Sequence, residues 1–316
     1  MKDYLKLIRI PNLVFIAILL WVMEKWVAVP VLGQSLWQEQ LPWWLLMLLI
    51  VSTVLIAAGG YVINDYFDVK IDRINRPERL IVTRTISKEQ AMRFFQILTT
   101  CGIAMGIAVA VVVRSTTLGL IYVVVPGLLW FYSSSYKRQF IVGNVIVAFA
   151  SALVPMLIAF ANVSYLKHSY GEVVQYSPAS HDLYIWLGGF ALFAFLCTWI
   201  REVIKDLQDQ TGDRELECHS MPIKMGETPT KVFVTAMVLL TVGLIAWLAF
   251  SILPFSHVWG CLSIRYVVFG LFVPFVCLLW LVWAAKIPSD YRAPQFLAKF
   301  IMFLGTLYAY VISVSL

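Results

Sequence analysis

Nine apolar runs, each long enough to cross a bilayer, constrain this chain more than any other feature. A transmembrane helix needs roughly 20 predominantly apolar residues. The runs cover approximately residues 12–32, 43–63, 94–113, 117–133, 141–161, 183–200, 231–253, 266–285 and 296–315. The composition agrees, because 61% of the 316 residues are hydrophobic and only 13% are charged. We therefore expect an all-α integral membrane protein, with residues 1–316 forming a single transmembrane domain.

The distribution of Lys and Arg predicts the orientation, because basic loops are retained in the cytoplasm. If the N-terminus is cytoplasmic, almost all of the 24 basic residues lie on that side. The exceptions are Arg114, Lys167 and Arg265 outside, and Lys25 within a span. We expect an N-in protein of the cytoplasmic (inner) membrane. The net charge of +6 then reflects topology, so we expect no nucleic-acid partner, and no obligate protein partner is indicated.

The loops between the runs differ sharply in character. The predicted cytoplasmic loops, 64–93 and 201–230, are long and rich in both signs of charge, so we expect them to cap a functional site. Residues 162–182 are expected to form the longest outer loop, with no chemical role. Glu24 and Lys25 lie towards the far end of the first span, where snorkelling or mutual pairing can accommodate them.

Acidic side chains gather where the second run leaves the membrane, in "YVINDYFDVKIDRINRPERLI", residues 61–81. If the helix continues through this stretch, Asp65, Asp68 and Asp72 fall within a sector of roughly 60°, with Asn64 at its edge. A single cluster of this kind could also be a solvated helix end.

A second acidic stripe makes the solvated-end interpretation less favourable. "TWIREVIKDLQDQTGDRELE" places Glu202, Asp206, Asp209 and Asp213 on one narrow face of the sixth helix, on the same predicted side of the membrane. Clustered carboxylates repel one another unless cations lie between them. Oxygen ligands from Asp and Asn suit Mg²⁺, which usually completes its coordination with water and substrate phosphate oxygens.

Two acidic helix ends backed by apolar walls predict a site for a polyprenyl diphosphate. The diphosphate needs metal and polar groups at the membrane edge, and the hydrocarbon tail needs an apolar tunnel. Metal-bound diphosphate is a good leaving group, so the predicted reaction is prenyl transfer. Four nearby basic residues could assist by binding the diphosphate: Arg9, Lys137, Arg201 and Lys205.

Two other classes of protein also carry clustered acids or bind metal at a membrane. An ion-coupled transporter also uses intramembrane acids, but its sites lie near the bilayer midplane, whereas the acids here cluster at one face. A silent scaffold that binds lipid or metal would gain nothing from the mutual repulsion of these carboxylates. Both are therefore less favoured than an enzyme.

At these residues the sequence resembles the UbiA superfamily of intramembrane prenyltransferases. The first family signature, NDxxDxxxD, matches residues 64–72, and the second, DxxDxxxD, matches residues 206–213. Three lesser features agree: "LIRIPN" with Arg9 and Asn12, "YSSSYKR" ending at Arg138, and "GNVIVAFAS" beginning at Gly143. The resemblance covers essentially the whole chain. It implies nine transmembrane helices around a central cavity, with the two Asp-bearing loops as a cytoplasmic cap.

The resemblance also implies roles for individual residues. The metal, Mg²⁺ or Mn²⁺ in its place, would be held by Asn64, Asp68, Asp209 and Asp213, with support from Asp65, Asp72 and Asp206. Asp68, Asp72, Asp209 and Asp213 would be the catalytic residues. Arg9 and Lys137, with Lys205, would bind the diphosphate, and Asn12, Arg79, Arg84 and Arg201 would contact the acceptor.

The acceptor is less closely defined than the donor. Both charged segments are most similar to the branch that makes digeranylgeranylglyceryl phosphate, so the preferred reaction joins geranylgeranyl diphosphate to geranylgeranylglyceryl phosphate in ether-lipid synthesis. An aromatic quinone precursor, such as 4-hydroxybenzoate or 1,4-dihydroxy-2-naphthoate, is the alternative. Where that branch reads RPxRPIPSGRIS, this chain has "RPERLIVTRTIS", with Leu80 for Pro and Thr83-Arg84 for Ser-Gly. Loss of a Pro and a Gly can alter the backbone of this loop and its acceptor contacts.

Overall fold

The computed structural model describes residues 2–35, 37, 39–75, 77–252 and 258–315. Over these residues the regular structure is helical, apart from one isolated bridge between Val82 and Ile86. Nine helical segments within the same ranges are long and apolar enough to cross a membrane. The prediction of an all-α, multi-pass membrane protein is therefore confirmed.

The chain divides into two compact units. Unit 1 comprises Met1–Lys137 and Leu153–Gly189, and unit 2 comprises Arg138–Ala152 and Phe190–Leu316. The chain passes from one unit to the other three times, between Lys137 and Arg138, within α8 (Val142–Tyr170) and within α9 (Pro178–Glu215). That residues 1–316 act as one domain stays a prediction.

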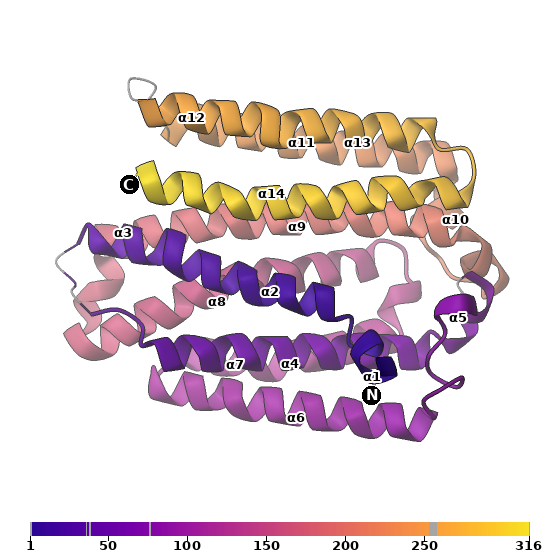
Figure 1. Ribbon diagram of the computed structural model, residues 1–316, viewed down its shortest axis with the longest axis horizontal. Helices are drawn as coiled ribbons and strands as arrows, with labels where there is room; N and C mark the ends of the chain where they lie inside the picture. The colour runs from indigo at the N-terminus through magenta and orange to yellow at the C-terminus, as the bar shows by residue number, and fades with distance from the viewer. Residues whose placement is uncertain (1, 36, 38, 76, 253–257, 316) are drawn as a thin grey trace. The chain divides into compact units, whose positions relative to one another are not determined.

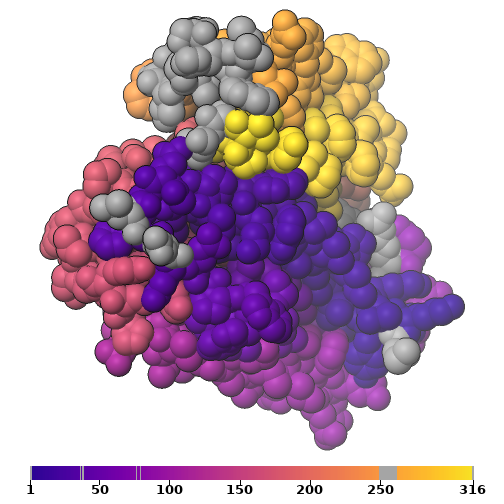
Figure 2. Space-filling view, turned by 60° about the vertical axis from the view of Figure 1, so that its left-hand side comes forward, coloured from indigo at the N-terminus to yellow at the C-terminus, as the bar shows by residue number. Residues whose placement is uncertain are grey.

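Unit 1 contains the first four candidate spans and parts of the next two (Figure 1). The remaining elements of this unit are α1 (Lys2–Leu7), α2 (Ile10–Val22), the π-helical η1 (Met23–Ala28), α3 (Val29–Gly33), α4 (Trp43–Phe67), α5 (Val69–Asn75), the 3-10 helix η2 (Pro77–Arg79), α6 (Lys88–Val112), α7 (Thr116–Ser134) and the 3-10 helix η4 (Glu172–Tyr176). The 3-10 helix η3 (Tyr136–Arg138) lies at the boundary between the units. In the space-filling view, the first part of the chain, coloured indigo to purple, lies exposed on the face of this unit that is turned to the viewer (Figure 2).

Unit 2 contains the last three candidate spans and the C-terminal part of α9. Its further elements are α10 (Met221–Met225), α11 (Glu227–Ile252), α12 (Val258–Tyr266), the π-helical η5 (Val267–Phe272), α13 (Val273–Ala284), the 3-10 helix η6 (Pro288–Tyr291) and α14 (Arg292–Ser315). Its core forms where α9, α11, α13 and α14 meet, with Leu207, Val234, Phe275 and Ile301 all buried.

Close packing of α6 against α4 and α7 depends on two glycines one turn apart. A Cβ atom at Gly102 would lie 3.1 Å from the backbone nitrogen of Ile56 on α4. A Cβ atom at Gly106 would lie 2.3 Å from the ring of Tyr122 on α7. Small residues at this spacing let membrane helices approach closely, where van der Waals packing replaces the hydrophobic effect as the attractive force. Helix α6 therefore packs closely against the middle of α4 and against α7.

The start of α6 has a clear sequence cause. Ser87 is its N-cap and forms a capping box with Gln90, in which each side chain accepts a hydrogen bond from the other residue's backbone. The preceding turn, residues 81–86, is anchored by Val82 and Ile86, which are buried against α1, α4, α5 and α6. The predicted cap segment, residues 64–93, therefore contains a turn that packs against the helices bearing the first acidic motif.

The prediction of a long outer loop over residues 162–182 is wrong. Helix α8 continues to Tyr170, η4 follows after Gly171, and α9 begins at Pro178. The polar Ser- and Tyr-rich composition of this stretch obscured the helical continuation. The two spans are therefore longer than their apolar runs.

Glu24 is neither at the surface nor paired with its neighbour. Its side chain is 1% exposed and accepts a 2.6 Å hydrogen bond from Asn162 Nδ2 on α8, whereas Lys25 is exposed. The snorkelling or mutual-pairing interpretation is therefore wrong for Glu24. The pair links η1 to α8 inside unit 1 by a polar contact between membrane spans.

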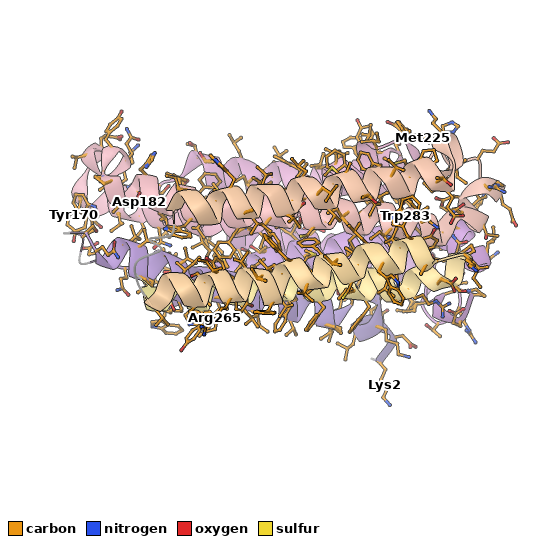
Figure 3. The ribbon with its side chains drawn as sticks, turned by 90° about the horizontal axis from the view of Figure 1, so that it is seen from above. Lys2, Tyr170, Asp182, Met225, Arg265 and Trp283 are labelled. Carbon is orange, nitrogen blue, oxygen red and sulfur yellow. The ribbon has the colours of Figure 1, made fainter. Side chains whose placement is uncertain are left out.

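The outer surface of the helices has the character expected for contact with lipid. Large apolar side chains such as Trp43, Phe269 and Trp280 are highly exposed. Figure 3 shows nitrogen and oxygen atoms gathered towards the helix ends, with carbon along the middle. Within unit 1, Tyr170 and Asp182 lie at one end and Lys2 lies towards the other (Figure 3).

Candidate active site

The first acidic motif lies at the junction of α4 and α5. Helix α4 ends at Phe67 and Asp68 is its C-cap, with φ −81° and ψ −1°. Helical hydrogen bonds nevertheless continue through the junction, because Asp68 N donates to Asn64 O at 2.9 Å and Asp72 N donates to Asp68 O at 2.8 Å. The predicted continuation of the helix is confirmed, with a local bend at Asp68.

Asp68 is the centre of a buried polar cluster. Its carboxylate is 5% exposed, pairs with the Lys137 ammonium, and accepts a 2.7 Å hydrogen bond from Asn64 Nδ2. The Asn64 Oδ1 atom lies 3.4 Å from Lys137 Nζ. Burial, the largest single effect, lowers the pKa of Lys137, but Asp68, Tyr132 and Asp72 together raise that pKa above its ordinary value, with Asp68 contributing most. Lys137 is therefore a firmly charged cation held by two oxygen atoms of the motif.

Arg9 makes the second link to this motif. It lies between α1 and α2, and its Nη2 atom is 2.6 Å from Asp65 Oδ1. Its guanidinium carbon also lies 5.0 Å from the centroid of the Tyr61 ring. Burial, the largest single effect, lowers the pKa of Arg9, but Asp65, Tyr61 and Asp68 together raise it, so the net pKa lies above the ordinary value. Two of the three basic residues assigned to the diphosphate, Arg9 and Lys137, thus contact the first motif, whereas Lys205 lies on α9 in unit 2.

The second acidic motif lies near the C-terminal end of α9, in unit 2. The helix is continuous through Glu215, so the predicted placement of Asp206, Asp209 and Asp213 on one helix is confirmed. Asp206 Oδ2 accepts a 2.8 Å hydrogen bond from Asn144 Nδ2 on α8. Asp213 carries an additional backbone role, because its carbonyl accepts a 2.8 Å hydrogen bond from Cys218 N.

Glu202 organises the basic residues one turn before this motif. Its buried carboxylate pairs with Arg201 and lies 3.9 Å from Lys205 Nζ. Further along α9, the side-chain oxygen of Gln208 accepts a hydrogen bond from the side-chain amide of Gln295 on α14. The second motif is therefore held from both sides within unit 2.

Two residues of these clusters were missed as site residues by sequence reasoning. Asn144 was noted only within the "GNVIVAFAS" run, and Glu202 only as part of the acidic stripe. Both motifs have the same arrangement, in which an asparagine amide donates to a motif aspartate: Asn64 to Asp68, and Asn144 to Asp206. An Asn at the start of an apolar run was the sequence signal available for Asn144.

The proposed acceptor residues belong to different elements of the two units. Asn12 lies half-buried in the first turn of α2, and its backbone N donates to Arg9 O at 2.8 Å. Arg84 is exposed on the turn before α6, and Arg201 is paired with Glu202 in unit 2. The side chain of Arg79 lies outside the described part of the structure. The acceptor assignments stay predictions.

The donor atoms at the two motifs suit a hard cation, although they do not by themselves complete a metal site. Asn64 and Asp68 already direct oxygen atoms at one cationic nitrogen, that of Lys137. Among the described residues, no group of three or more His, Cys, Asp or Glu side chains is gathered closely enough to hold a metal ion. A metal at either motif therefore needs further oxygen atoms, and Mg²⁺ usually takes these from water and substrate phosphate.

Comparison with known proteins gives a consistent result. A model of the UbiA prenyltransferase family matches residues 27–307. A curated relative from Sulfolobus acidocaldarius is 30% identical over 72% of this chain and 71% of its own length, and one from Methanopyrus kandleri is 32% identical over 80% and 82%. Both are named digeranylgeranylglyceryl phosphate synthase.

Solved structures show the same fold. A structure from a study of digeranylgeranylglyceryl phosphate synthase in membranes has a TM-score of 0.65 and 24% identity, covering 100% of this chain and 99% of the other. A UbiA homologue from Archaeoglobus fulgidus, bound to GPP and Mg²⁺, has a TM-score of 0.58 and 15% identity, covering 98% and 99%.

Proposed function

Because the chain belongs to the UbiA prenyltransferase family, we propose that it transfers a geranylgeranyl group from its diphosphate to geranylgeranylglyceryl phosphate. The names of the two relatives from Sulfolobus and Methanopyrus support this choice of product. One observation of the structure carries the proposal. The Lys137 ammonium is held by Asn64 and Asp68 at the end of an apolar span, where a diphosphate head would meet the membrane edge.

In this reaction the basic residues bind the negative charge that develops on the leaving group. The C–O bond of the donor breaks, and both electrons pass to the diphosphate oxygen. The acceptor hydroxyl oxygen forms the new ether bond and releases its proton. Lys137, Arg9 and Lys205 would donate charge-assisted hydrogen bonds to the diphosphate, and such bonds are stronger than neutral ones.

Divalent metal use is part of the proposal. The structure of the Archaeoglobus homologue contains Mg²⁺ together with GPP. In this chain Mg²⁺, or Mn²⁺ in its place, would neutralise charge on the leaving diphosphate. We assign its direct ligands to Asn64, Asp68, Asp209 and Asp213, with Asp65, Asp72 and Asp206 in support. Lys137, which contacts the oxygens of Asn64 and Asp68, would then turn its ammonium towards the phosphate oxygens.

The acceptor phosphate suits the arginines assigned to it. A guanidinium group matches phosphate geometry with paired N–H donors. Arg84, Arg201 and Arg79 would supply these donors, and Asn12 would contact the glycerol part. An aromatic quinone precursor lacks this phosphate and is not favoured by the names of the relatives. Ion transport is not favoured either, because the family consists of prenyltransferases.

We place the site at the cytoplasmic face of the inner membrane. The chain is an integral multi-pass membrane protein. The concentration of Lys and Arg around both acidic motifs supports a cytoplasmic location for them. From that side, a soluble diphosphate product could leave directly into water.

A product assay tests the proposal. The purified chain in lipid nanodiscs would be incubated with geranylgeranyl diphosphate, Mg²⁺, and either geranylgeranylglyceryl phosphate or an aromatic acceptor, with products identified by mass spectrometry. We expect digeranylgeranylglyceryl phosphate from the first mixture only. Prenylation of the aromatic acceptor alone would overturn the acceptor assignment. No prenyl transfer to any acceptor would overturn the reaction.

Metal removal is the matched control in the same assay. Excess EDTA should abolish product formation, and added Mg²⁺ or Mn²⁺ should restore it. Diphosphate release at an unchanged rate in EDTA would contradict the metal assignment while leaving the acceptor result intact.

A further inference from the structure

Arg9 is held in an unusual backbone conformation. Its φ of 55° and ψ of 57° lie in the left-handed region, which residues other than glycine rarely adopt. The preceding helix α1 is anchored by Leu7, which is fully buried, and by Tyr4, whose ring packs edge-on against Phe94 at 5.0 Å. These contacts direct the Arg9 side chain towards α4.

The Arg9 guanidinium contacts α4 in two chemically different ways. Its Nη2 atom donates to Asp65 Oδ1 at 2.6 Å, and its central carbon lies over the Tyr61 ring, 5.0 Å from the ring centroid. Tyr61 and Asp65 lie one helical turn apart, so both side chains project from the same face of α4. The aromatic face attracts the cation electrostatically and leaves edge N–H groups available to other acceptors.

We propose that Tyr61 is a positioning residue for the diphosphate: its ring holds the Arg9 guanidinium in place when Asp65 is engaged by the metal. This inference rests on the function proposed above. Asp65 is adjacent to the metal ligands assigned there. Its carboxylate binds Arg9 less strongly when it also interacts with the metal ion. The Tyr61 ring carries no charge and competes for no metal, so its hold on Arg9 persists in both conditions.

A mutant cycle with kinetics tests this role. Four variants are compared with the parent chain: Tyr61→Leu, Tyr61→Phe, Arg9→Gln, and Tyr61→Leu combined with Arg9→Gln. We expect Tyr61→Leu to raise the KM for the prenyl diphosphate about three- to thirty-fold, the range for loss of a cation–π contact. Tyr61→Phe keeps the ring and should restore the KM to within about twofold of the parent value.

The double variant separates positioning from general damage. If Tyr61 acts through Arg9, adding Tyr61→Leu to Arg9→Gln should cause no further rise in KM. An equal rise in both backgrounds would overturn the proposal, because the ring would then act independently of Arg9. An unchanged KM in Tyr61→Leu would overturn it as well. Gel filtration and thermal unfolding in detergent check that each variant is folded.

Binding of inorganic pyrophosphate with Mg²⁺, measured by calorimetry on the same proteins, distinguishes this proposal from the proposed function. If the parent chain binds pyrophosphate and forms product, and Tyr61→Leu has the same affinity and KM, only the role of Tyr61 is refuted. Parent chain that neither binds pyrophosphate nor forms product would refute the proposed function, and the role of Tyr61 with it.

Discussion

At the scale of single residues, the contact between Lys137 and Asp68 is the most consequential feature of the first motif. Replacing Lys137 with Met leaves the buried Asp68 without its cation and removes a proposed phosphate donor. We expect prenyl transfer to fall by at least about a hundredfold, as for other charge-stabilising donors. Steady-state product formation measures the effect. The exposed neighbour Arg138, changed to Gln, is the matched control and should retain activity.

The raised pKa of Lys137 makes a related prediction about pH. The pKa of Lys137 is higher in the folded state than in the unfolded state, where it is about 10.4. The charged lysine therefore stabilises the fold fully below about pH 10.4, and this stabilisation is lost only as the pH rises through the folded-state pKa. Lys137 should therefore stay charged up to about pH 10. A loss of activity between pH 8 and 10 that disappears in Lys137→Arg would contradict this assignment.

Thr83 is the strained residue of the turn before α6. Its φ of 77° lies in the left-handed region, where a β-branched side chain is unfavourable. Thr83→Gly should raise the free energy of unfolding by about 1 kcal/mol. Thr85→Gly, in the same turn but without positive φ, should instead lower it by roughly 0.5 kcal/mol. Unfolding in mixed micelles compares the two, and equal effects would show that the strain is not significant.

At the scale of helices, the bond between Glu24 and Asn162 connects two membrane spans in unit 1. Polar contacts between such spans average about 0.6 kcal/mol and reach about 1.7 kcal/mol. Because both partners are buried, we expect a coupling free energy towards the upper end of this range. A double-mutant cycle with Glu24→Ala and Asn162→Ala measures it.

Glu24→Gln is the informative control for this cycle. Its amide oxygen still accepts from Asn162, so it should retain more stability than Glu24→Ala. Strictly additive alanine variants would show that the two side chains do not stabilise each other.

At the scale of the whole molecule, the end of the helices at which a residue lies predicts the side of the membrane on which it is found. Within unit 1 Asp182 and Lys2 lie towards opposite ends, and within unit 2 Arg265 and Met225 do so as well (Figure 3). All four are exposed. Single cysteines at these positions, in a chain with its native cysteines replaced, would be tested with an impermeant maleimide in intact cells.

The expected labelling follows from an N-in orientation. Cysteines at positions 182 and 265 should react from outside, and those at positions 2 and 225 only after permeabilisation. The reverse pattern would place both acidic motifs outside the cell and would exclude a cytoplasmic active site.

The spans and both acidic motifs could be predicted from the sequence because their signals are local. The length of an apolar run determines whether a helix can cross a bilayer. The spacing of Asp206, Asp209 and Asp213 determines that they share one helical face. The same local reasoning failed at residues 162–170, where polar composition concealed a helix.

The partners of these residues were decided only by the tertiary structure. Lys137 is 69 residues from Asp68, Arg9 is 56 from Asp65, and Asn144 is 62 from Asp206. No periodicity in the chain relates such distant positions. Their contacts depend on how helices pack, including the close approach at Gly102 and Gly106. The sequence by itself therefore determined which helices form and which faces carry charge, whereas packing determined which cation each carboxylate meets.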